Sequence, residues 1–484
     1  MLFISMLIPT IGALLLFACR SLKPSMRNTI FLGSSVLASL CVLVCLLNPE
    51  PQTMVLFQIG TITDCVLSLD GLGRVFAGII ALLWPLASYY SIGYMAHEGK
   101  ESSFFGFYLL SYAVTLGIAF SADIMTLFIF YEMLALSTLF LVMHKMKAKR
   151  VHAGRTYMYY SLGGAGLALI AVQFVMHYTG GKSTFCYGGI AALANAPFDM
   201  MLIIFLFGFF GFGVKAAIFP LHSWLPAAGV APTPVTALLH AVAVVKAGVF
   251  AVIRLSHYTF SPASLTGTWV QTFCLIIIMI SIVYGSGMAV KEQHLKRRLA
   301  YSTMSNLSYV LFGVMLLTPQ GLSAGLAHMV FHAIMKITLF ASVGAIMVQA
   351  NRNYVEDIRG MSKVMPITIA VFTFCAIALV GIPPFIGFQS KWMLASAAIG
   401  TPLGIAGIVT LIISAILTAI YMLIPAVSAY TLPLSETSAL TEEAHDPNHW
   451  MLAPLVILAL MVLVLSFSSG WLINILNQVA NGLL

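Results

Sequence analysis

The chain has 484 residues, of which 60% are hydrophobic and 8% are charged, and its mean hydropathy is +1.00. This composition excludes a soluble globular protein and indicates a chain that crosses a membrane many times. The net charge of +8 could suggest a nucleic-acid partner, but the basic residues follow the membrane topology described below, which argues against one. The seven cysteines form no Cys-x-x-Cys pair and no metal-ligand spacing, so we predict no cofactor and assign any redox chemistry to partner proteins.

Apolar segments of roughly twenty residues, the length that crosses a bilayer, recur along the whole chain. The first is too long and too weakly charged in front for a cleaved signal peptide, so we interpret it as the first helix. The long connection from Asn48 to Asp70 predicts a short hairpin outside the membrane. The sequence therefore predicts an all-α polytopic membrane protein with about fourteen transmembrane helices, near residues 2–19, 29–47, 72–96, 104–120, 122–143, 156–178, 199–218, 235–256, 269–289, 300–317, 322–349, 366–399, 403–430 and 451–474.

The basic residues divide unequally between the two sides of these spans. Of the 23 Lys and Arg residues, sixteen lie in connections that follow odd-numbered spans, three lie on the other side, and four lie deep inside spans. The two smaller sets are Arg74, Lys182 and Arg254, and Lys215, Lys246, Lys336 and Lys391. Because cytoplasmic loops are enriched in Lys and Arg, the odd-numbered spans should end in the cytoplasm, and both termini should face outward from the cell membrane.

Proline interrupts two spans in mid-course, at Pro220 and at Pro383-Pro384. If spans 4–8 and 9–13 are two units of five, each interruption falls in the fourth helix of its unit, and an odd number of spans requires the second unit to be inverted. Unwound backbone at membrane depth must line a cavity or be buried, so these breaks point to an ion site. The predicted organisation is helices 1–3 (1–103), a first five-helix repeat (104–257), an inverted second repeat (258–430), and an acidic loop with a C-terminal helix (431–484).

Lysines inside the membrane are functional candidates, because a charge at the bilayer centre costs about 2.5–3.5 kcal/mol. We place Lys215 on a helix just before the break at Pro220. Glu132, deep in the fifth span, is the acid farthest from a span end, and we predict that it pairs with Lys215 and adjusts its charge state. The alternative is a protonated glutamic acid held by neighbouring helices.

Lys246 has about ten residues of span on each side, which argues against a side chain that snorkels to the surface. His240 lies six residues earlier. Its near-neutral pKa in water suits proton hand-over, so we predict a relay role. The alternative is a structural histidine bonded to the backbone.

Span 11 carries His328, His332 and Lys336 at positions i, i+4 and i+8, which form a stripe on one helix face. Two histidines at this spacing also match half of a metal site, but no acid or cysteine joins them, so we favour a proton wire over a metal. Lys391 follows the second break and is the predicted last station, with a snorkelling lysine as the alternative. If all four lysines inside spans were charged, one glutamate could not balance them, so some of these lysines must be neutral. A stepwise proton relay requires such groups that change between charged and neutral forms.

The other acids receive structural interpretations. Three lie at helix starts, where a negative charge favours the helix dipole: Asp70, Asp123 and Asp199. Four predict a solvated cytoplasmic loop: Glu436, Glu442, Glu443 and Asp446.

At these residues the chain resembles the antiporter-like membrane subunits shared by respiratory complex I, membrane-bound hydrogenases and multisubunit sodium/proton antiporters (the D-type subunit). The matching motifs are Lys215-x4-Pro220-Leu-His222-x-Trp-Leu-Pro226, Ala231-Pro-Thr-Pro234-Val-x-Ala-Leu-Leu-His240 with Lys246-Ala-Gly, the His328/His332/Lys336 span, Glu132, Gly381-Ile-Pro-Pro-x2-Gly-Phe-x2-Lys391 and Leu69-Asp70-Gly71-Leu72. They cover nearly the whole chain.

The resemblance implies a fourteen-helix fold with two inverted five-helix repeats and a line of ionisable residues between two half-channels. It implies that Glu132 and Lys215 are the first pair, that Lys246 with His240 is the link, and that Lys336 and Lys391 are the exit branch. Two departures are visible: Ala227 replaces an acid that the family usually carries after Trp-Leu-Pro, and no long lateral helix follows span 14, which predicts a middle position in an assembly.

The leading functional hypothesis is a membrane subunit that moves protons, with sodium exchange left open, inside a larger complex. Its predicted partners are other membrane subunits, among them homologous antiporter-like ones, a peripheral redox arm and the lipid bilayer. The enzyme class stays open between a non-redox subunit of a redox-driven ion translocase and a subunit of a secondary antiporter. Two alternatives remain, a quinone-interacting redox subunit and a structural membrane anchor without transport.

Overall fold

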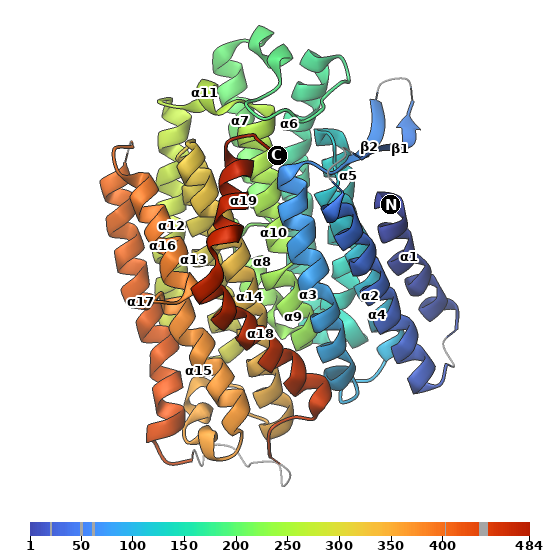
Figure 1. Ribbon diagram of the computed structural model, residues 1–484, viewed down its shortest axis with the longest axis vertical. Coiled ribbons are helices and arrows are strands. Elements are labelled where there is room, and N and C mark those ends of the chain that lie inside the picture. The colour runs from blue at the N-terminus through green and yellow to red at the C-terminus, as the bar shows by residue number, and fades with distance from the viewer. Residues whose placement is uncertain (20–21, 49–51, 61–62, 402, 435–443) are drawn as a thin grey trace.

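The computed structural model describes residues 1–19, 22–48, 52–60, 63–401, 403–434 and 444–484, and most of these residues lie in helices that run side by side (Figure 1). A helix satisfies its backbone hydrogen bonds internally, which a bilayer demands. Within the described residues ten helices are long and apolar enough to cross a membrane. The chain is therefore a multi-pass, essentially all-α membrane protein.

The long apolar helices are α2 (Pro24–Leu47), α3 (Gly71–Met95), α4 (Glu101–Ala119), α5 (Ile124–Val142), α6 (Ala148–Thr179), the segment Thr233–Thr259, α12 (Trp269–Lys291), α14 (Pro319–Ala350), α17 (Gly404–Thr431) and α18 (His449–Ser468). Shorter apolar helices are α1 (Leu2–Ala18), α7 (Phe198–Gly213) and α15 (Pro366–Val380). The remaining α-helices are α8 (Trp224–Ala227), α9 (Thr233–Ala241), α10 (Val244–Ile253), α11 (Pro262–Leu265), α13 (Leu295–Met315), α16 (Ile386–Ala398) and α19 (Gly470–Ala480).

Each predicted span coincides with one of these helices or with a pair of them. The twelfth predicted span is the pair α15 and α16, separated at the predicted break. The eighth predicted span coincides with the segment Thr233–Thr259, and it contains an interruption that was not predicted, because α9 ends at Ala241 and α10 begins at Val244. Both proline breaks contain a cis peptide bond, at Phe219-Pro220 and Pro383-Pro384.

The connection between α2 and α3 forms the predicted hairpin. Strands β1 (Thr53–Ile59) and β2 (Thr63–Ser68) pair antiparallel, with a register shift between Val55 and Phe57. Figure 1 shows the hairpin projecting at one end of the bundle, with both chain termini in the same half of the molecule.

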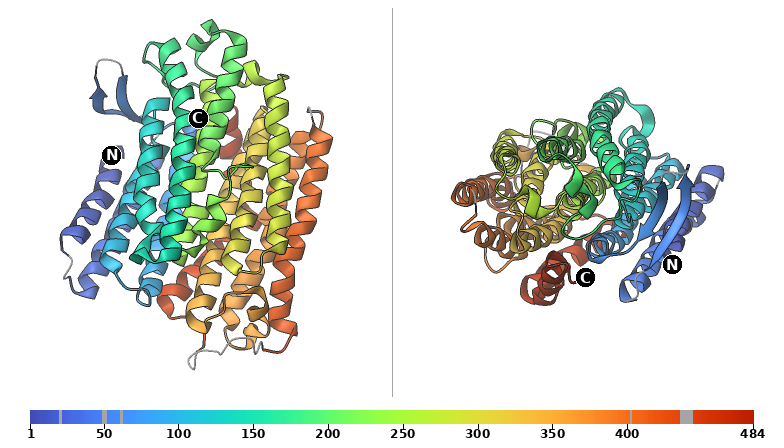
Figure 2. Two further views of the ribbon diagram at one scale, coloured as in Figure 1. Left: turned by 180° about the vertical axis from the view of Figure 1, so that it is seen from behind. Right: turned by 90° about the horizontal axis from the view of Figure 1, so that it is seen from above.

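Two segments are buried on all sides, α14 and the segment Thr233–Thr259. Helices α13, α15, α16 and α9 pack against α14, while α18 and α19 contact both α3 and α14. Seen from above in Figure 2, the early helices (blue to teal) and the later ones (yellow to orange) occupy opposite sides of the molecule. The predicted polar stripe on α14 therefore lies inside protein and away from lipid.

Two of the three acids predicted at helix starts, Asp70 and Asp123, accept backbone amides there. The Asp70 side chain accepts the amide of Gly73, and the Asp123 side chain accepts the amides of Met125 and Thr126. Asp446 was predicted in a solvated loop, but its side chain accepts the amides of Ile367 and Thr368 at the start of α15. The other three acids of the predicted cytoplasmic loop, Glu436, Glu442 and Glu443, lie outside the described residues.

Candidate functional site

Lys215 lies in the break that follows α7, and the prediction that it sits on the helix itself is wrong. The helix ends two residues earlier, and Ala217 adopts a positive φ of 57°. The helical hydrogen bonds therefore end before Pro220, which has no amide proton to donate. Lys215 Nζ donates to the carbonyl of Tyr131 and lies 3.5 Å from Glu132 Oε1. The expected pair of Lys215 and Glu132 is present.

Helix α5 presents both partners to this turn. The Tyr131 hydroxyl donates to the carbonyl of Phe212 at 2.7 Å, and its ring centroid lies 3.3 Å from Lys215 Nζ. The Lys215 side chain is 1% exposed and that of Glu132 is 24% exposed. The pair therefore joins a buried amine to a carboxylate at the edge of the interior, where charges attract more strongly than in water.

Lys246 follows the break that the sequence did not predict. The amide of Ala243 bonds to the carbonyl of Leu238, five residues back, so the turn is wider than in a regular helix. The carbonyl of His240 lies 3.5 Å from Lys246 Nζ. The same nitrogen lies 2.7 Å from Nδ1 of His332, and Lys246 is fully buried.

His240 is fully buried on the last turn of α9, and its ring lies 4.8 Å from that of Phe340. Neither of its ring nitrogens has a hydrogen-bond partner among the described residues. Its carbonyl contacts Lys246, while its imidazole faces an apolar neighbour, so the relay role of its ring stays a prediction.

The predicted stripe on α14 continues from Lys246 toward α16. The rings of His332 and His328 lie 6.0 Å apart. His328 Nδ1 lies 2.9 Å from the Ser390 hydroxyl, and its Nε2 lies 3.2 Å from Asn306 Oδ1. Because an amide oxygen can only accept, Nε2 carries the proton. Within the described part of the chain, no cluster of three His, Cys, Asp or Glu side chains surrounds a possible metal position.

Lys336 turns away from the histidines. Its Nζ donates to the Ser302 hydroxyl at 2.7 Å and to the Leu299 carbonyl at 3.2 Å. Ser302 lies 2.7 Å from the Tyr421 hydroxyl. The contacts of Lys336 therefore lead to α13 and α17, and they do not connect it to Lys391.

Lys391 lies on α16 and faces the end of α15. Its Nζ donates to the carbonyls of Leu379 and Val380 at 2.9 and 2.8 Å, and it lies 5.5 Å from the ring centroid of Tyr309. These carbonyls belong to the last turn of α15, where no helical amide can bond them. Lys391 is partly buried and next in sequence to Ser390, the partner of His328.

The structure brings together one chain of contacts and one separate pair. Lys246 contacts His332 and His328 contacts Ser390, the two histidine rings lie 6.0 Å apart with no hydrogen bond recorded between them, and Lys215 and Glu132 form their own pair. The two groups are close, because a Cβ added to Gly248, two residues after Lys246, would meet the Lys215 carbonyl carbon at 2.7 Å.

Several polar partners were missed from the sequence. Ser302, Asn306, Ser390 and Tyr421 are common residue types without a motif, and only the tertiary contacts reveal them. Lys296 was assigned to the connection before the tenth span, but it lies on the first turn of α13, is 4% exposed and donates to the Ala231 carbonyl at 2.7 Å.

Arg254 was also interpreted only as a topology signal. It is buried and forms an ion pair with Asp70, with nitrogen–oxygen distances of 2.5 and 2.6 Å. This pair ties the end of the segment Thr233–Thr259 to the start of α3.

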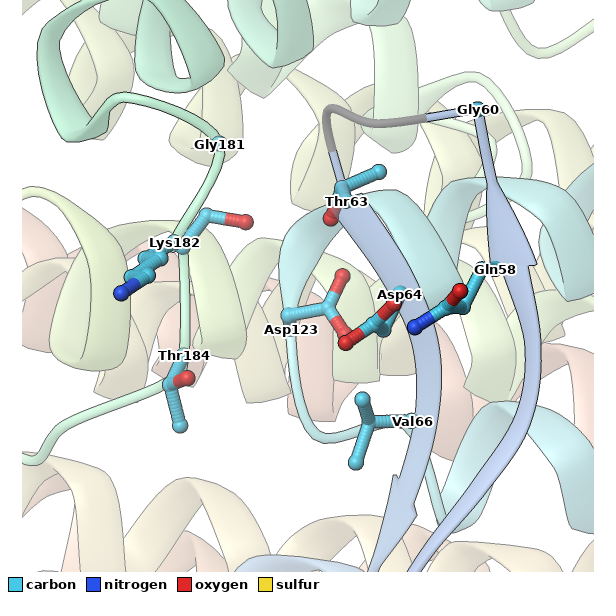
Figure 3. Close-up of a pocket in the computed structure, with 10 residues that line it drawn as sticks. Gln58, Gly60, Thr63, Asp64, Val66, Asp123, Gly181, Lys182 and Thr184 are labelled. Carbon is cyan, nitrogen blue, oxygen red and sulfur yellow. The ribbon is translucent and has the colours of Figure 1, made fainter.

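A separate polar cavity of about 450 Å³ lies at the hairpin end (Figure 3). The side chains of Asp64 and Asp123 are turned toward one another, whereas that of Lys182 points away from them (Figure 3). None of its lining residues belongs to the line of lysines and histidines described above.

Comparison with known proteins relates this arrangement to a family. Residues 121–442 match the family model described as NADH:quinone oxidoreductase/Mrp antiporter, TM. The chain is 29% identical over 439 residues to hydrogenase-4 component B of Escherichia coli (strain K12), covering 86% of this chain and 64% of that protein. It is 28% identical over 416 residues to NADH-quinone oxidoreductase subunit N of Desulforudis audaxviator (strain MP104C), covering 84% and 81%.

The fold is also found in a solved complex. A chain of respiratory complex I from Thermus thermophilus with bound NADH superposes with a TM-score of 0.86 at 22% identity, covering all of this chain and 99% of the other. This likeness establishes the fold. The chain spans just under two thirds of the length of component B, so the activity of that whole protein is not carried over.

Proposed function

Because the chain belongs to the NADH:quinone oxidoreductase/Mrp antiporter transmembrane family, we propose that it conducts protons across the membrane as one subunit of a larger complex. The single observation that carries the proposal is the 2.7 Å contact between Lys246 Nζ and His332 Nδ1, both fully buried. At this distance a proton passes from amine to imidazole without movement of either heavy atom.

The surroundings of the amines support changes of charge. The partners recorded for Lys246, Lys336 and Lys391 among the described residues are imidazole, hydroxyl and carbonyl groups, all of them neutral. A buried ammonium without a carboxylate costs several kcal/mol, so the neutral amine is accessible. Each proton that arrives on one group therefore raises the cost of a second charge nearby.

The pair of Lys215 and Glu132 supplies the adjustable step. While the pair is formed, the carboxylate stabilises the ammonium form of Lys215. When the two separate, the buried amine gives up its proton toward the neighbouring helix α10, whose Gly248 lies against the backbone of Lys215. His240 and Lys246 receive it, His332 and His328 pass it on, and Lys391 is the last station.

The proposed topology has fourteen transmembrane helices, with both termini outside the cell membrane. Residues 1–103 form three preceding helices, residues 104–257 and 258–430 form two inverted five-helix repeats, and residues 431–484 form the loop and last helix. The breaks at Pro220 and at Pro383-Pro384 occupy corresponding helices, and each has one lysine beside it, which supports the inverted arrangement.

The proposed partners are other membrane subunits of the same complex, including homologous antiporter-like subunits, and a peripheral redox arm that drives transport. Two features support a subunit over a self-contained redox enzyme: the family description and the amine and imidazole chemistry of the site. The site residues hold protons, and the electron chemistry is assigned to the partners.

The test replaces Lys246 by methionine, which keeps length and burial but cannot carry a proton. In membrane vesicles containing the assembled complex, Lys246→Met should lower proton uptake about 100-fold, the contribution typical of a positioned acid–base group. The matched control is Lys291→Met, an exposed lysine at the end of α12, which should transport normally.

The alternatives give other results. A structural anchor predicts that Lys246→Met alters assembly while assembled complexes pump at the wild-type rate, and this result would overturn the proposal. A quinone-interacting redox subunit predicts a bound chromophore in the spectrum of the purified chain and an equal loss of electron transfer and pumping.

A further inference from the structure

Two cavities lie side by side at the end of the bundle opposite the hairpin. One, of about 510 Å³, is lined by basic side chains, and the other, of about 520 Å³, is lined mainly by apolar atoms. They share Lys149, Val230 and Arg297 as lining residues. A single molecule with an anionic end and an apolar end would contact both.

The charges of the basic cavity are not balanced. Glu98 is already held by Arg150, with nitrogen–oxygen distances of 2.9 and 3.3 Å. Arg297 pairs with Glu292 at 3.0 Å. This leaves Lys149 and Lys296, neither of which forms an ion pair with a carboxylate among the described residues.

Burial of Lys296 makes the excess positive charge of the basic cavity energetically unfavourable. Its side chain is 4% exposed, and the acceptor recorded for it is the carbonyl of Ala231. A buried ammonium without a counter-charge costs several kcal/mol, so the neutral amine is accessible here too, and an anion bound in this cavity would stabilise the ammonium form of Lys296. Surface lysines alone do not have this property.

Two helix starts add to the positive field. α6 begins at Ala148 and α13 begins at Leu295, and neither has a side-chain cap. Ala148, Lys149 and Arg150 of α6 line the cavities, as do Lys296 and Arg297 of α13. The Leu295 amide bonds to the Asn353 carbonyl, so the other first-turn amides of the two helices accompany the lysines, and helix N-termini are sites that bind phosphate groups.

The apolar cavity fits a hydrocarbon chain beside this phosphate position. Its lining includes Ala153, Pro226, Ala227 and Val230, with the ring of Tyr301. Basic pockets between transmembrane helices at the cytoplasmic side are suited to anionic lipid head groups. The basic side chains put this end of the molecule on the cytoplasmic side by the same charge argument used for the topology.

We infer that these paired cavities bind one anionic phospholipid of the cytoplasmic leaflet, with its phosphate between Lys149 and Lys296 and an acyl chain beside Pro226 and Ala227. The inference goes beyond proton conduction and does not depend on it. Lys296 also holds the Ala231 carbonyl just before α9, so the bound lipid stabilises the segment that leads to His240.

The test measures binding of phosphatidylglycerol and phosphatidylcholine to the purified full chain in detergent, by native mass spectrometry. The wild-type chain should retain one phosphatidylglycerol with at least tenfold preference over phosphatidylcholine. Lys296→Met should remove that preference, and Lys149→Ala, at an exposed position, should reduce it several-fold. Lys291→Met is the control, because this exposed lysine at the same end lines neither cavity.

Three results would overturn the inference. Equal retention of the two lipids by the wild-type chain would remove the charge requirement. Unchanged retention by both Lys296→Met and Lys149→Ala would place the lipid elsewhere. Complete displacement of phosphatidylglycerol by millimolar inorganic phosphate would assign the site to a soluble anion. None of these outcomes bears on proton uptake, so failure here is separable from failure of the proposed function.

Discussion

At the first break Lys215 faces the carboxylate of Glu132, whereas at the second break Lys391 faces the carbonyls of Leu379 and Val380. A carboxylate loses its charge when it is protonated or when its side chain rotates away. The carbonyls at the end of α15 cannot do either, because they belong to the backbone and carry the fixed partial negative charge of a helix C-terminus. Lys215 also donates to the backbone carbonyl of Tyr131, so the comparison teaches that the first lysine has an adjustable partner beside a permanent one, whereas the recorded hydrogen-bond acceptors of the second are backbone carbonyls.

The largest expected effect comes from removing the adjustable partner. Glu132→Gln keeps the shape of the side chain but leaves Lys215 without a counter-charge, so proton uptake by the assembled complex in vesicles should fall about 100-fold. Glu101→Gln is a matched control, because Glu101 has the same 24% exposure and also pairs with a base, Arg27. Equal transport by Glu132→Gln and Glu101→Gln would contradict the assigned role of Glu132.

The second break is tested through its backbone. Gly381 has a φ of +89° and ends α15 beside Lys391, and a Cβ there would lie 3.0 Å from Lys391 Cδ. Gly381→Ala should cost about 1–2 kcal/mol of stability for the left-handed conformation. It should also lower proton uptake about tenfold, because small misplacements of a reacting group reduce rates strongly.

The control for this backbone change is Gly400→Ala. Gly400 has a similar φ of +79°, but no atom lies within 4 Å of the added Cβ. The two variants should therefore unfold at similar temperatures and differ in transport. If they transport equally, the carbonyls that hold Lys391 are not part of the pathway.

Much of the bundle could be predicted from the sequence, because a helix at membrane depth needs a long apolar run and a proline interrupts it. Both proline breaks were predicted in this way. Of the partners that distinguish the two lysines, the sequence predicted only that of Lys215. The pair of Glu132 and Lys215 followed from the rarity of acids inside spans. The carbonyls around Lys391 are backbone atoms, which no residue pattern distinguishes.

The break before Lys246 shows a different limit. The stretch from Leu239 to Val245 contains neither proline nor glycine, so nothing in it indicates an interruption. The wide turn at Ala243 exists in the packed structure, where α9 lies against α14 and α3. Lys296 was misplaced for a related reason, because basic residues at a helix start look the same whether they face water or a buried carbonyl.

The smallest expected effect concerns the ion pair of Glu98 with Arg150 at the end of the bundle. Unlike Glu132, Glu98 is a carboxylate with a structural role alone. Burial raises the pKa of Glu98, but the hydrogen bond and charge of Arg150 outweigh it, so the pKa lies below its usual value. The pair therefore stabilises the fold fully above the usual glutamate pKa of about 4.3, and this stability is lost as the pH falls through the lower folded-state pKa. Glu98→Gln should unfold more easily than the wild-type chain at pH 7 by about 1 kcal/mol or less, with proton uptake unchanged. Unfolding in detergent at pH 7 and pH 3 measures this gap, which must shrink at the lower pH, and a gap that widens there would show that Arg150 does not lower the pKa of Glu98.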